Sequence, residues 1–336
     1  MRSVVGVCLL LLILLQGSCT QTAPLPVLPQ GSPSAYPSDS PSNIASDITA
    51  DNPPDNETLR LIYEHGEELF YSNLVDKDAQ NAVSHILLAA GADETDVEEV
   101  FAWVDDFNDF VKDIPSLPLE ASFVPFDEHF PFERGTNYDV QTKWSRSGKP
   151  HTEILCRILV FHLLRDVILA QNLIPEADWH VTEVDGDYSG SLLSSDFEII
   201  QTNPYLNWTT DEIRRYFTVF NPTPLPGTAS EADLYGAISN MWAERGVAFT
   251  TGRLSLVTVW RQNEEFELAV SAHAAVLAEF DGGLLLLEKT NPFRPYQATI
   301  FNHRAEVKAY MLDKLVAILG DGTGTAIVMA NGVLLH

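Results

Sequence analysis

Two stretches of the chain contain residues whose types could perform nucleophilic chemistry. The first covers residues 150–171 and has Cys156 near its start. The second covers residues 270–288, where His273 stands among small residues and Glu288 closes an apolar run. A cysteine nucleophile acts as a thiolate, which a helix N-terminus, a nearby imidazole and a third group that holds the imidazole can together provide. Cys156, His273 and Glu288 are therefore the candidate catalytic set.

The stretch around Cys156 predicts a buried central helix. Its sequence, PHTEILCRILVFHLLRDVILAQ, is apolar on nearly every face, which is typical of a helix covered on all sides. It is short for a membrane span and contains charged residues, so we expect a core helix of a soluble domain. With Thr152 as the N-cap, Cys156 would lie at the end of the first turn, where the helix dipole acts more weakly than at the first residues.

His273 and Glu288 fall on neighbouring strand-like runs. Three such runs follow one another along the chain, at residues 254–260, 266–280 and 283–289. The Asp-Gly-Gly sequence at 281–283 is a favourable hairpin turn. Pairing across this turn would bring Glu288 close to His273.

A thiol hydrolase also needs an oxyanion hole. The backbone N–H of the cysteine normally supplies one donor, and a side chain just upstream supplies the other. Gln141, in the loop before the central helix, is our candidate for the second donor. The structural alternative is that Cys156 and His273 are packing residues of the core, which is the commoner role of a lone cysteine or histidine.

The order of the predicted elements indicates an α+β fold. Helical patterns dominate up to residue 246, and strand patterns follow, with one more helix over residues 304–319 and a hairpin over 326–335. We expect an N-terminal helical half whose buried central helix packs on a C-terminal antiparallel sheet. This is papain-like in plan, because papain-like thiol hydrolases carry the cysteine on a buried helix and the histidine and a polar residue on adjacent strands.

The beginning of the chain predicts export. Residues 1–19 join a basic residue, an apolar run and a lipobox-like end at Cys19, which predicts a secretory signal and lipidation of Cys19. Ordinary signal cleavage and free secretion is the alternative. Residues 20–56 are rich in Pro and Ser and predict a disordered tether, and residues 57–336 predict a single α+β domain. The protein would then be an exported, membrane-anchored lipoprotein that meets the membrane only through its N-terminal lipid.

The cysteine content leaves one thiol in the mature domain. Cys8 would leave with the signal and Cys19 would carry lipid, so Cys156 remains. An exported domain with one thiol has no internal disulfide, and its cysteine is either buried packing or a reactive group.

The charge balance excludes one class of partner. The chain has 47 acidic and 20 basic residues, a formal net charge of -27. Such a surface repels a phosphate backbone, so we expect no nucleic-acid partner. It suits cationic partners or metal ions.

A second constellation predicts a calcium loop over residues 185–196. Oxygen-bearing residues fall at the spacing of an EF-hand loop, with Gly190 at its sharp turn: Asp185, Asp187, Ser189, Ser191 and Asp196. Calcium here would brace a surface loop and would not take part in catalysis. A plain acidic surface turn is the alternative. His162, His180 and His303 do not fall at zinc-ligand spacing.

Several phrases of the sequence resemble the domain of unknown function 4300 family, a family of bacterial exported lipoproteins. The phrases lie at residues 71–77, 104–108, 156–158, 243–249 and 273–298. The resemblance covers residues 58–336 and implies distinctive positions for Cys156, His273 and Glu288. Leu155 departs from the family, which tends to place Asn before the cysteine. The family has no established activity, so the resemblance implies architecture more than function.

Two functions follow from these expectations. The first is an envelope-tethered thiol hydrolase that cleaves amide bonds of peptidoglycan stem peptides or of proteins, with no required cofactor. The second is a non-catalytic binding lipoprotein, with the aromatic loop over 123–138 as its ligand wall and calcium in the 185–196 loop. The geometry of Cys156 separates them. A hydrolase needs its sulfur within hydrogen-bond reach of a His273 ring nitrogen at the floor of an open cleft, whereas a binding module can leave Cys156 sealed in apolar side chains.

Overall fold

The computed structural model describes residues 58, 61–62, 68–125, 138–149, 153–183, 188–319 and 324–336. The described residues belong to one compact unit. The expected signal, Cys19 and the expected tether over 20–56 lie outside the described residues. Among the helices of the described ranges, none is both long and apolar enough to cross a membrane.

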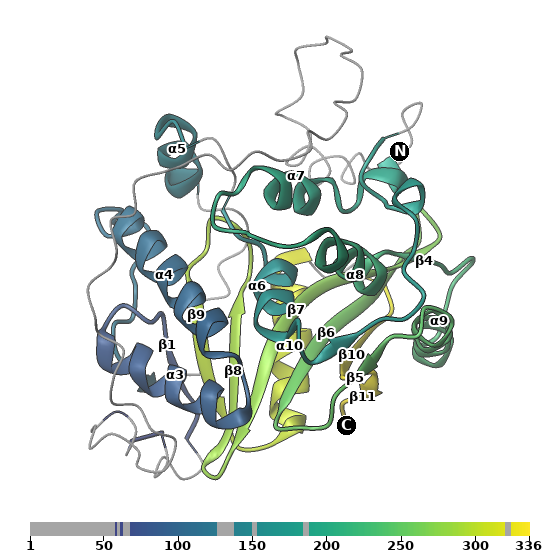
Figure 1. Ribbon diagram of the computed structural model, residues 1–336. Coiled ribbons are helices and arrows are strands. Elements are labelled where there is room, and N and C mark those ends of the chain that lie inside the picture. Colours follow the sequence, from purple (N-terminus) through teal and green to yellow (C-terminus); the bar gives the residue numbers. More distant parts are fainter. Residues whose placement is uncertain are drawn as a thin grey trace, which may run out of the picture. The chain divides into compact units, whose positions relative to one another are not determined.

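An antiparallel sheet forms the centre of the described unit (Figure 1). Its strands run in the order β11-β10-β6-β7-β8-β9-β1-β2, and β4 pairs with β7 outside this path. The long strands are β6 (Leu254–Asn263), β7 (Leu268–Phe280), β8 (Gly283–Lys289), β9 (Tyr296–Phe301) and β10 (Ala326–Ala330). The short strands are β1 (Phe70–Ser72), β2 (Val124–Pro125), β4 (Thr223–Pro224) and β11 (Val333–Leu334). A separate two-stranded sheet pairs β3 (Ile168–Leu169) with β5 (Ala248–Phe249).

Helices cover both faces of the sheet, which explains why its central strands are apolar almost without interruption. The helices are α3 (Lys77–Ala90), α4 (Glu94–Val111), α5 (Tyr138–Arg146), α6 (Cys156–Leu164), α7 (Ser194–Thr202), α8 (Thr210–Phe220), α9 (Glu231–Glu244) and α10 (Arg304–Leu319), with short 3₁₀ turns at Glu176–Asp178 and Tyr188–Ser191. Figure 1 shows α6 and α8 in front of the sheet and α10 behind it. In β8, for example, Leu285 and Leu287 join the core on the α6 side, whereas Leu284 and Leu286 pack with α10 residues. The predicted α+β class is confirmed.

Local signals in the sequence explain where several helices begin and end. α3 follows the N-cap Asp76 and ends at Gly91, whose φ of 104° is left-handed. α8 begins with a capping box in which Thr209 accepts from the N–H of Glu212 and the Glu212 carboxylate accepts from the N–H of Thr209. α9 has the same device at Ser230.

Replacing Thr209 with alanine is expected to lower the free energy of unfolding by about 1 kcal/mol, because the N-terminal N–H groups of α8 lose their side-chain acceptor. Urea titration of the purified protein measures this loss. Thr210→Ala is the matched control, since Thr210 is the first exposed residue within the helix and accepts no capping bond. Equal stability of the two variants would contradict the capping role.

The central helix differs from the prediction at both ends. α6 is nine residues long and stops at Leu164, and the chain then turns so that β3 can pair with β5. Its N-cap is Leu155, in extended conformation, and not Thr152. Cys156 is therefore the first residue of the helix, where the dipole acts most strongly on a thiolate. The buried central position of the helix is as predicted, because eight of its nine residues are buried.

Candidate active site

Cys156 opens α6 at a helix end that has no side-chain cap. The N–H groups of the first turn have no partner within a helix, so they point toward the region beyond its N-terminus. A thiolate placed there is stabilised by the positive end of the dipole, and an oxyanion can accept from the same N–H groups. Cys156 retains 5% of its surface exposed. The helix start thus suits a nucleophile and an oxyanion hole.

His273 lies on β7, next to a β-bulge. The register of β6 and β7 shifts between Val259 and Trp260, which pair with His273 and Ser271 and leave Ala272 unpaired. A bulge bends its strand and changes the direction of nearby side chains. The bulge therefore helps to direct the His273 ring toward the start of α6.

The three candidate residues form a connected line. The His273 imidazole and the Cys156 thiol interact electrostatically, and His273 is the largest influence that lowers the pKa of Cys156. On the other side, His273 Nε2 lies 2.6 Å from Glu288 Oε2. Glu288 pairs with Ala275, so His273 and Glu288 are diagonal neighbours on one face of the hairpin, as the turn at 281–283 predicted.

The far oxygen of Glu288 is held by α10. Lys314 Nζ lies 2.5 Å from Glu288 Oε1, and the Tyr310 hydroxyl donates to the same oxygen. Glu288 is fully buried and Lys314 is 3% exposed. The carboxylate therefore receives donors on both oxygens, as a buried charge requires.

Electrostatics favour a thiolate–imidazolium pair. Burial raises the pKa of the Cys156 thiol, but the His273 imidazole, with help from Arg157, more than compensates, so the pKa falls below its ordinary value. Burial lowers the pKa of His273, while Cys156 and Glu288 raise it by a larger amount. Burial also raises the pKa of Glu288, but the Lys314 cation and His273 bring it down to about 2. The shifts of the thiol and of the imidazole both go in the direction that favours transfer of the thiol proton to the imidazole.

Arg157 ties the start of α6 to the bulge in β7. Its guanidinium binds both oxygens of Asp196, with Nε at 2.8 Å and Nη2 at 2.6 Å. Nη1 donates to the Ser271 carbonyl at 2.9 Å, two residues before His273. The Tyr216 hydroxyl donates to Asp196 as well. One side chain thus fixes the helix that carries Cys156 against the strand that carries His273.

With this geometry established, the comparison with known proteins identifies the family. A family model described as Domain of unknown function (DUF4300) matches residues 70–335. The chain belongs to this family. No curated protein and no solved structure matches the chain.

Gln141 has a different position from the one expected in this DUF4300 chain. Residue 141 lies in helix α5, where a loop was predicted. α5 packs through Trp144 on Phe110, near the end of α4, and Lys143 donates to the Phe110 carbonyl. Within the described ranges, the backbone carbonyl of Gln141 accepts a hydrogen bond from the Ser145 hydroxyl. Its role as an oxyanion donor stays a prediction.

Only some residues of the expected calcium loop lie within the described ranges. Asp185 and Asp187 lie outside the described residues, and the side chain of Ser189 is not described. Ser191 ends a 3₁₀ turn. A Cβ on Gly190 would lie 2.5 Å from the Thr182 carbonyl oxygen, which explains the glycine at this close approach.

Asp196, expected as the last calcium ligand, has another role. It lies in the first turn of α7, 1% exposed, with Arg157 on both oxygens and Tyr216 on one of them. A guanidinium in this position repels a cation and occupies the lone pairs that calcium would use. The prediction for Asp196 is therefore corrected to a partner of Arg157.

The expected aromatic wall over residues 123–138 is described only at its ends. Phe123 is buried in the core, and Tyr138 begins α5 with 63% of its surface exposed. Residues 126–137 lie outside the described ranges. The wall stays a prediction.

The sequence reasoning did not single out three residues of the site. Tyr310 and Lys314 contact Glu288 from α10, and Arg157 contacts the Ser271 carbonyl from α6. The sequence of α10 contains a signal for Tyr310 and Lys314. They lie four residues apart beside buried Val307, Met311 and Leu315, so polar groups share the apolar face of a helix.

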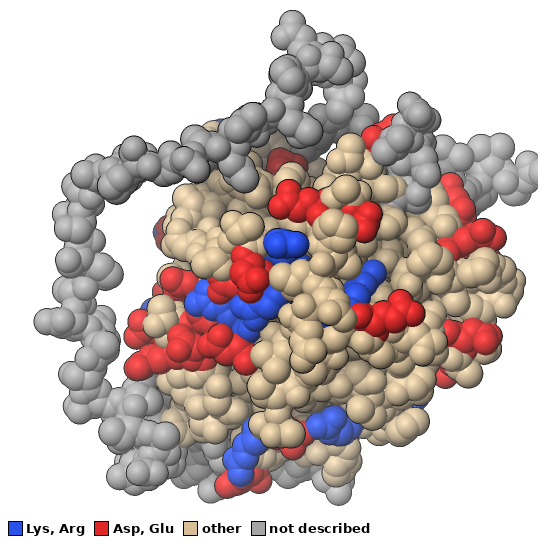
Figure 2. All heavy atoms as spheres, turned by 45° about the vertical axis from the view of Figure 1, so that its right-hand side comes forward, with Lys and Arg blue, Asp and Glu red and all other residues tan. Residues whose placement is uncertain are grey.

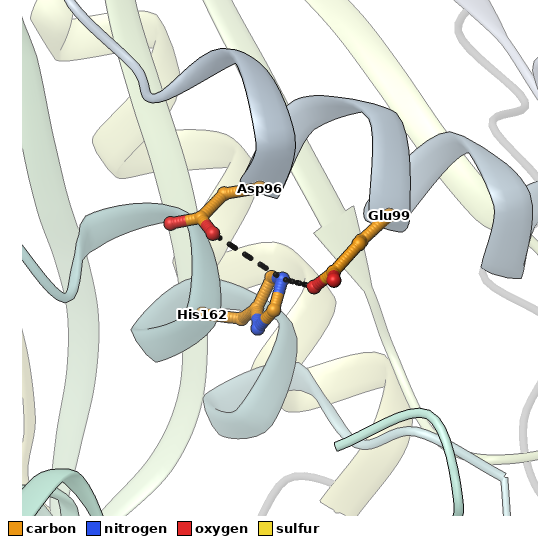
Figure 3. Close-up of side chains that lie close together, drawn as sticks. All are labelled: Asp96, Glu99 and His162. Atoms are coloured by element: carbon orange, nitrogen blue, oxygen red, sulfur yellow. Dashed lines mark ion pairs between the residues drawn. The ribbon is translucent and has the colours of Figure 1, made fainter. Parts of the chain in front are cut away.

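A second buried polar cluster joins α4 to α6 (Figure 3). His162 Nε2 lies 3.0 Å from Glu99 Oε2 and 3.8 Å from Asp96 Oδ1. Burial lowers the pKa of His162 to about 3, so its ring is neutral. Burial raises the pKa of Asp96 to about 6, although Arg165 opposes this shift. The histidine and two carboxylates come from separate helices, which is why spacing along the chain did not reveal them.

The donors of this cluster do not fit a metal ion. The indole N–H of Trp208 donates to His162 Nδ1 at 3.1 Å. A neutral ring that accepts at Nδ1 carries its proton on Nε2, the nitrogen that faces Glu99 and Asp96. That nitrogen has no lone pair for a metal. Arg165 also binds Asp96 through two nitrogens, so a cation already occupies this carboxylate. We assign the cluster to the packing of α6 on α4.

Proposed function

We propose that this DUF4300 chain is an exported thiol hydrolase that cleaves amide bonds of the cell envelope, in peptidoglycan stem peptides or in proteins. The observation that carries the proposal is that buried His273 interacts electrostatically with Cys156 and lies 2.6 Å from the Glu288 carboxylate. A packing cysteine would need no imidazole partner, and a packing histidine would need no ionised carboxylate behind it. The predicted signal and tether supply the envelope location, through an N-terminal lipid at Cys19.

In the first half of the reaction, the Cys156 thiolate attacks the amide carbonyl carbon and forms a C–S bond. The carbonyl electrons move to the oxygen, which accepts a hydrogen bond from the Cys156 N–H. The His273 imidazolium donates its proton to the amide nitrogen as the C–N bond breaks, and the amine leaves. Cys156 then carries the acyl group as a thioester.

In the second half, neutral His273 takes a proton from water, and the resulting hydroxide attacks the thioester carbon. The C–S bond breaks, the carboxylic acid leaves, and the thiolate–imidazolium pair is restored. Glu288 accepts from His273 throughout, which fixes the orientation of the ring. The chain needs no cofactor for these steps.

The charge of the surface is compatible with cationic peptide substrates. Figure 2 shows acidic side chains in several groups across the visible face, with fewer basic ones among them. The net charge of -27 favours approach of amine-bearing peptides over anionic ones.

Trapping of the acyl intermediate tests the proposal. The purified protein is mixed with peptidoglycan stem peptides or with a digest of envelope proteins, and the reaction is stopped with acid after short intervals. We expect a mass increase on the Cys156 peptide that equals an acyl fragment of the substrate, and no such increase in Cys156→Ala. The absence of both an adduct and newly released amines, over a range of envelope peptides, would contradict the proposal and favour a binding lipoprotein.

A further inference from the structure

Two buried lysines lie on opposite faces of the sheet, and one of them contacts the candidate site. Lys289, at the end of β8, is fully buried, and its Nζ lies 3.5 Å from the centre of the Phe107 ring and 4.0 Å from that of Tyr296. Lys314, on α10, binds the carboxylate of Glu288. Neighbouring residues of a strand point to opposite faces of the sheet, so Glu288 and Lys289 contact different partners.

The contacts of Lys314 converge on the line of Cys156, His273 and Glu288. Its Nζ lies 2.5 Å from Glu288 Oε1 and 3.3 Å from the Tyr310 hydroxyl oxygen. Lys314 also interacts electrostatically with Cys156. The interactions recorded for Lys289 are different: an electrostatic one with Glu153 and a hydrogen bond to the Arg294 carbonyl.

We propose that Lys314, with Tyr310, is a positioning residue of the hydrolase: it holds Glu288 as a carboxylate against His273 and balances the buried charge of the site. With a thiolate and an imidazolium at Cys156 and His273, the four charges sum to zero only if Lys314 is present. Because Lys314 neutralises it, Glu288 can remain a charged carboxylate in the protein interior. This inference rests on the proposed function, because it assigns Lys314 a part in the same site.

The groups that face Cys156 and His273, the dyad of the proposed mechanism, come from five elements. α6 supplies Arg157 beside Cys156, and α7 supplies Asp196, which Arg157 neutralises. β8 supplies Glu288, and α10 supplies Tyr310 and Lys314. β9 supplies Gln297, which is uncharged and donates to the Tyr310 hydroxyl at 2.8 Å. Arg294, between β8 and β9, is a further cation that interacts with Lys314. Removal of Lys314 therefore makes the total charge around the Cys156–His273 pair more negative by one.

An additional negative charge raises the proton affinity of both partners. The thiol then loses its proton at higher pH, and the imidazolium keeps its proton to higher pH. The pH range in which the ion pair exists moves upward as a whole. A lysine with a merely structural role would change stability and leave this range where it is.

The test is the pH profile of Cys156 alkylation by iodoacetamide in the full chain, followed by mass spectrometry of the Cys156 peptide. In Lys314→Met we expect the acidic midpoint to rise by about one pH unit relative to the wild type. Lys289→Met is the matched control, because it removes a lysine that is buried to a similar degree and that interacts, among the described residues, with Glu153 and the Arg294 carbonyl. We expect it to keep the wild-type midpoint.

The outcomes separate this inference from the proposed function. A wild-type midpoint near that of a free cysteine overturns both. A low wild-type midpoint that is unchanged in Lys314→Met, or that moves equally in Lys289→Met, overturns only the role of Lys314. If Lys314→Met does not fold, Tyr310→Phe decides, since it removes one donor to Glu288 and keeps the ring. A smaller shift in the same direction then supports the inference, and no shift overturns it.

Discussion

The Cys156→Ala variant is expected to lose at least about 10³-fold in the rate of amide hydrolysis, because no other group in the site can form the acyl intermediate. The second expectation is non-additivity. His273→Ala alone should lose a similar factor, and the double variant should be no slower than either single one, since the two residues act as one unit. Initial rates of amine release from the substrate found by acyl trapping measure all three variants.

His303→Ala is the control for these rates. His303 is exposed and lies just before α10, away from the residues that hold Glu288. It should retain the wild-type rate. Two observations would contradict the mechanism: a Cys156→Ala variant with substantial activity, or losses from Cys156→Ala and His273→Ala that multiply in the double variant.

Glu288→Gln is expected to lower the free energy of unfolding by about 3 kcal/mol at pH 7, because the carboxylate that neutralises buried Lys314 is lost. The pKa of Glu288 falls from 4.5 to about 2 in the folded protein. A depressed pKa contributes stability that is fully present above the unfolded pKa of 4.5 and is lost as the pH falls through about 2. The difference between wild type and variant should therefore shrink to roughly half or less at pH 3.

Urea unfolding at pH 7 and pH 3 measures this dependence. Glu279→Gln is the control, because its ion pair with Arg304 is largely exposed and should contribute less than about 1 kcal/mol at either pH. A loss in Glu288→Gln that is equal at the two pH values would mean that the charge of Glu288 does not stabilise the fold.

Local signals predicted the elements whose ends are set by neighbouring residues. Asp76, Thr209 and Ser230 are residue types that favour N-caps, and each of them caps its helix. The turn at 281–283 fixes the register of β7 and β8, and this register alone brings Glu288 next to His273. The proximity of His273 and Glu288 could therefore be predicted from the sequence.

Elements that depend on distant partners were missed. β1 exists because it pairs with β9, more than 200 residues away in the chain. α5 and α7 lie in stretches that read as an aromatic loop and an acidic turn. Aromatic packing of Trp144 on Phe110 and the ion pair of Asp196 with Arg157 hold these helices in place. α6 was predicted too long, because the strand pairing of Ile168 and Leu169 with β5 is not visible in an apolar run.

The residues that support the site were also missed, because they depend on contacts between distant parts of the chain. Arg157, Tyr310 and Lys314 lie on helices that meet the sheet from opposite faces. Spacing along the chain carries no information about such contacts. What the sequence does indicate is a polar residue on an otherwise apolar helix face, and each of these three residues is one.

The most direct test of the central claim is the pH dependence of Cys156 alkylation by iodoacetamide, in the wild type and in His273→Ala. The account predicts a wild-type midpoint well below the value of about 8.5 for a free cysteine, and a shift toward that value when the imidazole is removed. At pH 6 this corresponds to a loss of roughly ten-fold or more in rate. A wild-type thiol that labels only after denaturation, or a midpoint that His273→Ala does not change, would contradict an activated pair and leave Cys156 as a residue of the core.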